Sequence, residues 1–459
     1  MATIDQAGIA ARLDRMPATR HVWGLVTLLS LGGVFEFYDL FFTAYVVPGL
    51  VHGGLLTNVK LSIFSGPATF VAATFGGLFI GTIAFSYVAD RYGRRSIFTL
   101  SLLWYSVCTA VMAFQTTGLG LNVWRLVAGI GIGVELVTID TYIAELVPKH
   151  MRGRAFAFNQ TVQFAVVPIV ALLAWKLVPI APLGFDGWRW VVLIGSAGAL
   201  VVWFLRLGLP ESPRWLLQHG RLDEAERVTA RIEARVAADL GGSLPPPAPH
   251  AAHEAEGRGS FAEIWVPPYR RRTIMLMVFQ FFQTIGYYGF ASWVPTLIEQ
   301  QGIHLRASLA YSFIIAIANP FGPLLAISIA DRLERKWIIV GAAIGIAVFG
   351  LAFAAQSTVA LLILFGVLVT LANNILSFSF HAYQTELFPT RVRARAVGFT
   401  YSWSRLSAVF VSFIIAFLLK SGGVPAVFGF IAFAMLVVVL SIGVFGPRTR
   451  GLQLEEISR

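Results

Sequence analysis

Long apolar stretches follow one another along almost the whole chain, separated by short polar segments. Most approach about 20 residues, which is enough for an α-helix to cross a hydrocarbon core of roughly 30 Å. Apolar and polar residues do not alternate within them, so the pattern predicts helices rather than the strands of a membrane barrel. We expect twelve membrane-spanning helices, at about 22–47, 66–89, 96–115, 119–143, 154–179, 188–208, 273–299, 307–330, 337–356, 358–383, 394–420 and 424–446.

The one long polar stretch, residues 209–272, separates the first six expected spans from the last six. In residues 222–240 apolar side chains recur at helical spacing, which predicts an amphipathic helix packed against the cytoplasmic mouth of the bundle. The Pro- and Gly-rich segment after it is typical of a flexible linker. We therefore expect a six-helix bundle over 1–208, a cytoplasmic linker over 209–272 and a second six-helix bundle over 273–459.

The two expected bundles share motifs at one constant offset. YIAELVPKHMRGRAFAF begins at Tyr142 and YQTELFPTRVRARAVGF begins at Tyr383, an offset of 383 − 142 = 241 residues. The tripeptide ADR at 89–91 returns at 330–332, which is the same offset. One offset that serves two motifs indicates a duplicated half. In a membrane protein a duplicated half is typical of a transporter whose site lies between the halves.

The composition agrees with a membrane protein, because 57% of the residues are hydrophobic and only 13% are charged, against about 25% in soluble chains. The net charge of +11 reflects Lys and Arg gathered in the loops on the side of both termini. The positive-inside rule then places both termini in the cytoplasm. The expected partner is thus the lipid bilayer and not nucleic acid. We expect a monomer in the plasma membrane, or in the inner membrane if the source is bacterial.

Several ionisable residues fall inside the expected spans. Each costs about 2.5–3.5 kcal/mol to insert, so such residues are functional candidates by default. They are Glu36, Asp39, Arg125, Glu135, Asp140 and Arg405.

Asp39 and Arg125 both fall in the outer half of the first bundle, where the two side chains can meet. A carboxylate that pairs with arginine when ionised, and releases it when protonated, is a two-state element that proton binding can bias. We therefore predict that Asp39 and Arg125 couple transport to protons, with Glu36 and Glu135 as further members of the proton-coupling set. A static structural ion pair remains the alternative.

No nucleophile–base pattern and no His, Cys and carboxylate cluster at metal spacing occurs in the sequence. We therefore expect no enzyme activity, no catalytic residue, no metal and no cofactor. A membrane receptor that binds its ligand without transport is disfavoured, because 209–272 is too short and linker-like for a signalling domain.

These motifs resemble the major facilitator superfamily over essentially the whole chain, in particular DRYGRR at 90–95, DRLERK at 331–336, RLVAGIGIG at 125–133 and PESPRWL at 210–216. The resemblance is to the sugar-porter branch, in which charged groups at the cytoplasmic helix ends pair when the inner gate is closed. It implies alternating access, Asp39 and Arg125 as the proton-coupling pair, and a cytoplasmic gate network of Asp90, Arg91, Arg95, Glu145, Arg152, Asp331, Glu386 and Arg393.

The positions that contact hexose in that branch differ here. The seventh-helix pattern QQ-x3-GIN is replaced by Phe282-Gln283 and then Gly286-Tyr287-Tyr288. The same positions are more similar to metabolite:proton symporters and to organic-ion and synaptic-vesicle-2-like transporters, in which an eleventh-helix arginine serves an anionic substrate. The resemblance assigns that role to Arg405.

We therefore expect symport of protons with a small organic anion, a carboxylate and perhaps an aromatic one, with a sugar or polyol symporter and a drug or metabolite exporter as alternatives. The expected substrate-binding residues combine the cation with aromatic and hydrogen-bonding side chains. They are Arg405, Gln163, Gln283, Tyr287, Tyr288, His381, Trp403 and Phe378.

Overall fold

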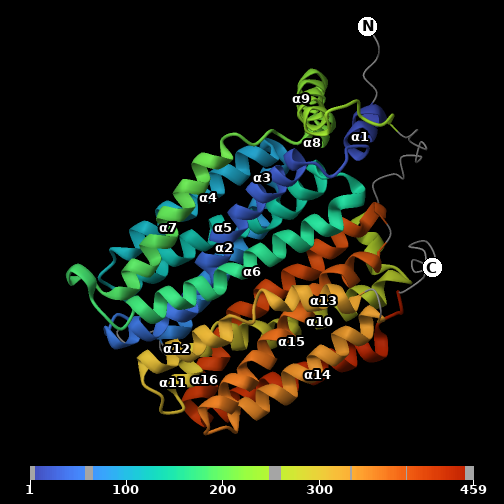
Figure 1. Ribbon diagram of the computed structural model, residues 1–459. Coiled ribbons are helices and arrows are strands. Elements are labelled where there is room, and N and C mark those ends of the chain that lie inside the picture. Colours follow the sequence, from blue (N-terminus) through green and yellow to red (C-terminus); the bar gives the residue numbers. More distant parts are fainter. Residues whose placement is uncertain (1–5, 57–65, 248–259, 331–332, 389, 450–459) are drawn as a thin grey trace.

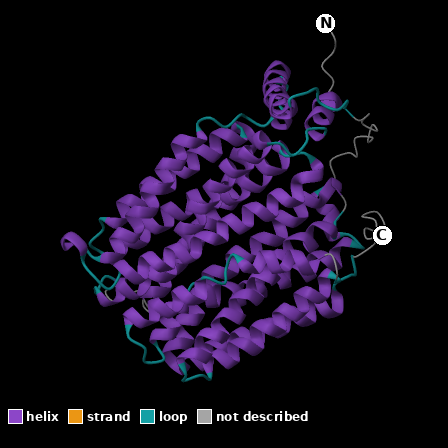
Figure 2. Cartoon of the chain, viewed as in Figure 1, coloured by secondary structure: helices purple, strands orange, loops and turns teal. Residues whose placement is uncertain are grey.

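A computed structural model describes residues 6–56, 66–247, 260–330, 333–388 and 390–449. In this part of the chain the regular elements are all helical (Figure 2). Among the described residues, eleven helices are long and apolar enough to cross a membrane. The last of them, within α16 (Thr390–Phe445), contains Gly423 at φ 64°, where one helix ends and the next begins. The expected break between 420 and 424 is thus confirmed, and so are the twelve spans.

The first half of the chain contributes six long helices that pack on one another. The long pairings are α2 with α6, α3 with α5, and α4 with α5 and α7. Their bounds are α2 (Arg20–His52), α3 (Gly66–Tyr92), α4 (Arg94–Ala113), α5 (Gly118–Leu146), α6 (Arg152–Leu177) and α7 (Gly187–Arg206).

Glycines let α3 and α5 approach backbone to backbone. A Cβ on Gly129 would lie 2.6 Å from the carbonyl oxygen of Thr74, and one on Gly133 would lie 2.9 Å from the Cα of Leu78. Small residues at helix crossings allow such close packing in membranes. The glycines of RLVAGIGIG therefore form a helix-packing face.

The second half repeats this arrangement, with two of its spans interrupted. The spans expected over 273–299 and 307–330 are present, but each is made of two helices. The structure divides the first into α10 (Tyr269–Ala291) and α11 (Val294–Glu299), and the second into α12 (Leu305–Ala316) and α13 (Phe321–Ala330). Pro295 follows the first break and Pro320 is the last residue of the second, and proline lacks the N–H that a continuing helix needs. The remaining spans are α14 (Arg335–Ala354), α15 (Val359–Glu386) and the two parts of α16.

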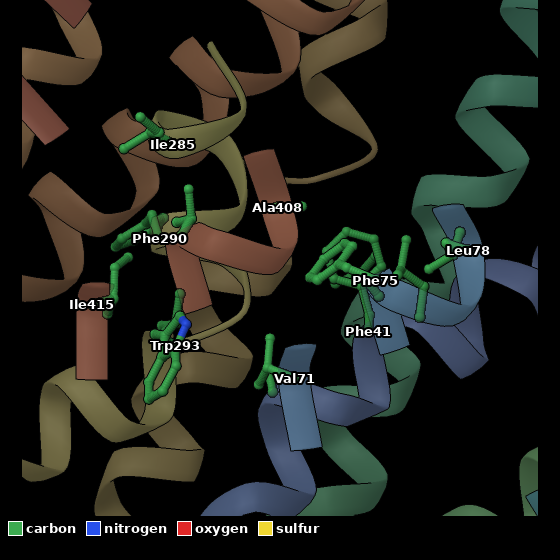
Figure 3. Close-up of a cluster of buried hydrophobic side chains, with 14 of the residues drawn as sticks. Phe41, Val71, Phe75, Leu78, Ile285, Phe290, Trp293, Ala408 and Ile415 are labelled. Atoms are coloured by element: carbon green, nitrogen blue, oxygen red, sulfur yellow. The ribbon is translucent and has the colours of Figure 1, made fainter. Parts of the chain in front are cut away.

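The two halves lie side by side and meet along a few helices (Figure 1). Contacts between them run from α3 to α16, from α6 to α12 and α13, and from α2 to α11. One apolar cluster crosses this boundary: Phe41, Val71 and Phe75 of the first half lie toward Ala408 and Trp293 of the second (Figure 3). Apolar side chains from both halves thus pack together where the halves meet.

Residues 222–240 form the predicted amphipathic helix, and a short helix precedes it. These are α8 (Pro213–Gln218) and α9 (Leu222–Leu240), which buries Ala225, Ile232 and Val236. An additional helix, α1 (Gln6–Asp14), packs beside them, and all three lie at one end of the bundle (Figure 1). We call this the inner end, because it is the end predicted to face the cytoplasm, and we call the opposite end the outer end.

Polar contacts tie α1 to α9. Arg12 donates hydrogen bonds to Glu233 at 2.6 Å and to Glu226 at 2.7 Å, and Arg15 donates to Glu233 at 2.5 Å. The apolar cluster under these helices draws only on the first half. Farther along the linker, η3 (Phe261–Trp265) packs instead on α10 and α16. The two ends of the linker are therefore fixed to different halves.

Candidate functional site

The fourth-span arginine and the first-span aspartate meet as expected. Arg125 Nη1 lies 2.8 Å from Asp39 Oδ2, and Arg125 Nη2 donates to the Asp39 carbonyl oxygen at 2.6 Å. Thr109 donates to the other carboxylate oxygen at 3.0 Å. Both charged side chains are buried, so the pair is desolvated and depends on these bonds.

The remaining donors of Arg125 also find partners in the first half. Nε donates to Thr74 at 2.8 Å and Nη2 to Thr43 at 2.5 Å. The guanidinium carbon lies 4.5 Å from the centre of the Phe42 ring. All of these groups belong to α2, α3, α4 and α5. All the described hydrogen bonds and ion pairs of Asp39 and Arg125 are therefore made within the first half.

A second buried ion pair lies nearer the inner end, and the sequence analysis missed half of it. Arg206 Nη2 lies 2.5 Å from Glu135 Oε1, and both side chains are fully buried. Arg206 also donates to the carbonyl oxygen of Phe98 at 2.9 Å and lies over that ring. The sequence does hold a signal for it, because Arg206 falls inside the expected span 188–208 as an unexplained charge.

Glu36 stands between these pairs on α2 without a direct partner. It is completely buried, and neither carboxylate oxygen has a hydrogen-bond partner in the described part of the chain. The charges that act on it are those of Glu135, Asp140, Arg206 and Arg405. Of these, only Arg405 belongs to the second half.

Arg405 is a buried cation held by neutral groups. Its Nη1 donates to the Tyr288 hydroxyl at 3.0 Å, and its Nη2 donates to the Tyr401 hydroxyl at 2.8 Å. Its side chain is 3% exposed, its Nε has no partner, and no described carboxylate lies within ion-pair distance. Tyr401 stands one helical turn before Arg405, on the same face of α16, yet it was not among the predicted site residues.

Two tyrosine rings lie at this cation, and the Tyr401 ring centre is 4.9 Å from its guanidinium carbon. The Tyr288 ring lies 4.5 Å from that of Phe75, which brings the two halves together, and 5.0 Å from that of Tyr287. Trp403 and Phe378 are partly buried and belong to α16 and α15. The Arg405 surroundings are therefore apolar rings with a few hydroxyl groups.

The other predicted substrate-binding residues are buried or half-buried at different places. Gln283 donates to Gln280 at 3.1 Å, inside the second half, whereas Gln163 of α6 packs on Gly33 of α2. His381 bonds the carbonyl oxygen of Ser377 at 2.7 Å and lies beside the Tyr401 ring at 5.7 Å. Of these three, His381 alone is shown in contact with the Arg405 surroundings.

A small cavity lies between the halves, farther toward the outer end. Tyr287 lines it together with three asparagines, Asn319, Asn373 and Asn374, as do Phe41 and Tyr45 of the first half. Asn374 donates to the carbonyl oxygen of Asn319 at 3.1 Å, which satisfies backbone freed by the helix break there. Oδ1 and Nδ2 of Asn373 are both buried without a hydrogen-bond partner among the described residues.

The predicted gate residues pair only within their own halves, as far as their side chains are described. Glu145 lies 3.3 Å from Arg94, and Glu386 pairs with Arg335. Arg95 donates to the carbonyl oxygen of Leu207, and Arg152 to that of Val147. The side chains of Asp90, Arg91 and Arg393, and the whole of Asp331, lie outside the described residues. The gate network stays a prediction.

At the outer end, contacts do join the halves. His52 lies 3.3 Å from Glu299, and the rings of Trp175 and Phe313 stack at 5.8 Å. Within the described residues no group of His, Cys, Asp and Glu has the arrangement of a metal site.

Two halves of membrane-spanning helices, with two charged pairs buried inside the first half, are typical of an integral membrane transporter. Residues 25–459 match the family model described as sugar (and other) transporter, and the chain belongs to this family, in the major facilitator superfamily. The family consists of transporters and not of enzymes, which agrees with the expectation from the sequence.

Similar proteins span the full length of the chain. A putative metabolite transport protein, YyaJ of Bacillus subtilis, is 30% identical over 97% of this chain and 96% of its own length. The niacin transporter NiaP of Acinetobacter baylyi is 27% identical over 98% of this chain and 99% of its own. The partially occluded inward open structure of the xylose transporter XylE from E. coli superimposes with a TM-score of 0.75, at 22% identity over 94% and 99% of the two chains.

Proposed function

We propose that this transporter is a symporter that moves a small organic monoanion, a carboxylate, together with a proton. The observation that carries the proposal is Arg405, a buried guanidinium whose partners are two tyrosine hydroxyl groups. A buried cation is costly without an anion, and hydrogen bonds to neutral hydroxyl groups do not cancel its charge. A substrate carboxylate supplies the directly bonded anion that Arg405 lacks.

The surroundings of Arg405 favour a flat or aromatic carboxylate. The guanidinium carbon lies 4.9 Å from the centre of the Tyr401 ring, and Tyr288, which accepts from Arg405, packs against the Phe75 ring. Such sites combine apolar walls with a few placed polar groups. Niacin, which is a carboxylate on an aromatic ring, fits this chemistry, and the similar protein NiaP is named a niacin transporter.

Asp39 and Arg125 are the proposed proton-coupling pair. When Asp39 is ionised, its carboxylate holds Arg125 in the first half, and protonation of Asp39 removes the charge that holds it. The proposed moving parts are the bundles 1–208 and 273–459, with the termini in the cytoplasm and the inner gate residues closing in turn. One proton with one monoanion carries no net charge across the membrane.

A neutral polyol or sugar is the second candidate, because of the asparagine-lined cavity. Asn319, Asn373 and Asn374 offer amide donors and acceptors, and hydroxyl groups of a sugar bind such groups. The cavity suits a neutral substrate, whereas Arg405 suits an anion.

A binding panel separates the two candidates. The purified chain is titrated with nicotinate, with nicotinamide, which has the same ring but no charge, and with xylose. We expect stabilisation against heat by nicotinate or a related carboxylate, weakened in Arg405→Gln. Stabilisation by xylose alone, unchanged in Arg405→Gln, refutes the anion proposal.

A further inference from the structure

Glu36 is the one buried carboxylate in the described bundle interior to which no hydrogen bond is donated. Its side chain is inaccessible to solvent and both oxygens lack a partner. By contrast, Asp39 accepts from Arg125 and Thr109, and Glu135 accepts from Arg206. An ionised carboxylate in such a place is stable only if a nearby positive charge compensates it.

The groups around Glu36 leave one cation for that role. The titratable and charged groups that act on it come from α4, α5, α7 and α16, and they are Tyr105, Glu135, Asp140, Arg206, Tyr401 and Arg405. On α6, packed against α2, the neutral Gln163 lies at Gly33, one turn before Glu36. Arg206 is already paired with Glu135 at 2.5 Å. Of the two arginines, Arg405 is therefore the one that is not paired with a carboxylate.

The electrostatic interaction between Glu36 and Arg405 joins the two halves, because Glu36 lies on α2 and Arg405 on α16. The Asp39–Arg125 pair has no such connection, since every group bonded to it belongs to the first half. A proton on Asp39 therefore has no direct way to sense an anion on Arg405. Glu36 does have one, through its electrostatic interaction with Arg405.

We propose that Glu36 links proton binding to anion binding: it is the counter-charge of Arg405 in the empty transporter, and it binds a proton when the substrate carboxylate takes Arg405. The inference rests on the proposed function and deepens it. Charge balances in both states. The empty site holds a carboxylate and a guanidinium, whereas the loaded site holds a carboxylic acid, a guanidinium and the substrate carboxylate.

One proton can serve both acids. Glu36 and Asp39 lie three residues apart on α2, and residues at this spacing share a helix face. Tyr105 interacts electrostatically with both of them, and its buried hydroxyl has no hydrogen-bond partner. A proton that leaves Asp39 thus reaches Glu36 without crossing to the other half, and the symport remains electroneutral.

The test is the pH dependence of anion binding to the full-length chain in lipid nanodiscs. Nicotinate is the probe, over about two pH units around neutrality, and the protons taken up are measured in weak buffer. We expect the affinity to fall as the pH rises, approaching a tenfold loss per pH unit, with about one proton taken up per anion bound. Glu36→Gln should bind nicotinate with an affinity that no longer depends on pH.

Three variants serve as controls. Glu36→Asp keeps a titratable group and should keep the pH dependence. Asp186→Asn removes an exposed acid at an outer loop and should behave as the unmodified chain. Asp39→Asn should still take up a proton on binding, because the binding-linked acid is Glu36.

Two results overturn the inference while the proposed function stands. One is an unchanged pH dependence in Glu36→Gln. The other is nicotinate binding by the unmodified chain without proton uptake, which needs no variant and is therefore decisive even if Glu36→Gln fails to fold. If neither nicotinate nor a related carboxylate binds to the unmodified chain at any pH, the proposed function itself fails.

Discussion

Replacing Arg405 tests the substrate anchor, and its geometry sets the size of the effect. The guanidinium reaches two hydroxyl groups through separate nitrogens, at 3.0 and 2.8 Å, so it can hold both oxygens of a carboxylate. Lysine keeps the charge but lacks the planar fork. Arg405→Lys should lose about one charge-assisted hydrogen bond, or about 1.5–3 kcal/mol, which weakens nicotinate binding roughly 10- to 150-fold.

Arg405→Gln removes the charge as well. Loss of one partner of a buried charged pair costs about 2–5 kcal/mol, so binding should weaken by a factor of about 30 to several thousand. Isothermal titration with nicotinate measures both variants, and thermal unfolding shows that they fold. Lys420→Gln, an exposed cation on the same helix α16, is the matched control and should bind as the unmodified chain. Equal affinity in Arg405→Gln and in the control refutes the anchor.

Three further predictions concern the other charged groups. Asp39→Asn should abolish accumulation of nicotinate against its gradient in proteoliposomes while exchange of labelled for unlabelled nicotinate continues; accumulation at the normal level contradicts a coupling role. Glu135→Ala should destabilise the chain by about 3–5 kcal/mol, because Arg206 is left buried and unpaired, and Glu135→Leu with Arg206→Met should recover most of the unfolding temperature; no recovery contradicts a structural pair. At the inner end, burial raises the pKa of Glu233 but hydrogen bonds from Arg12 and Arg15 outweigh it, so its pKa lies below the usual 4.5. A lowered pKa stabilises the docked α1 fully above pH 4.5, and this stabilisation is lost as the pH falls through the lowered value. The protection of the amides in 6–14 against hydrogen exchange, relative to an unstructured chain at the same pH, should therefore fall there and, at neutral pH, in Glu233→Gln; unchanged protection in both cases contradicts the prediction.

Hydrophobic pattern was sufficient for most of the fold, because a bilayer forces each long apolar stretch to form a helix. Even the boundary before Gly423 follows from it. The breaks near Pro295 and Pro320 were missed, since the apolar composition continues across them. The helix α1 was missed too, because nine residues are too short for a clear period and its docking depends on Glu226 and Glu233 far along the chain.

The site could be predicted only where a residue type is costly in a membrane. This criterion found Asp39, Arg125 and Arg405, and the structure pairs the first two as expected. Tyr288, one partner of Arg405, was named through the resemblance, but Tyr401 was missed, because a tyrosine inside a helix gives no sign in the sequence that it accepts from a cation. The criterion also did not distinguish the roles of the buried acids Glu36, Asp39 and Glu135. Those roles follow from which of these side chains already accept hydrogen bonds, and this depends on helix packing.

The most direct test of the central claim is uptake of nicotinate by proteoliposomes under two separate driving forces. An anion that enters with one proton moves no net charge, whereas each net charge would add about 2.3 kcal/mol per 100 mV. We predict that a pH gradient, acidic outside, drives accumulation at zero membrane potential, and that a potential alone, negative inside, drives none. Accumulation driven by the potential alone, or none under the pH gradient, contradicts the electroneutral symport of a proton and an organic anion.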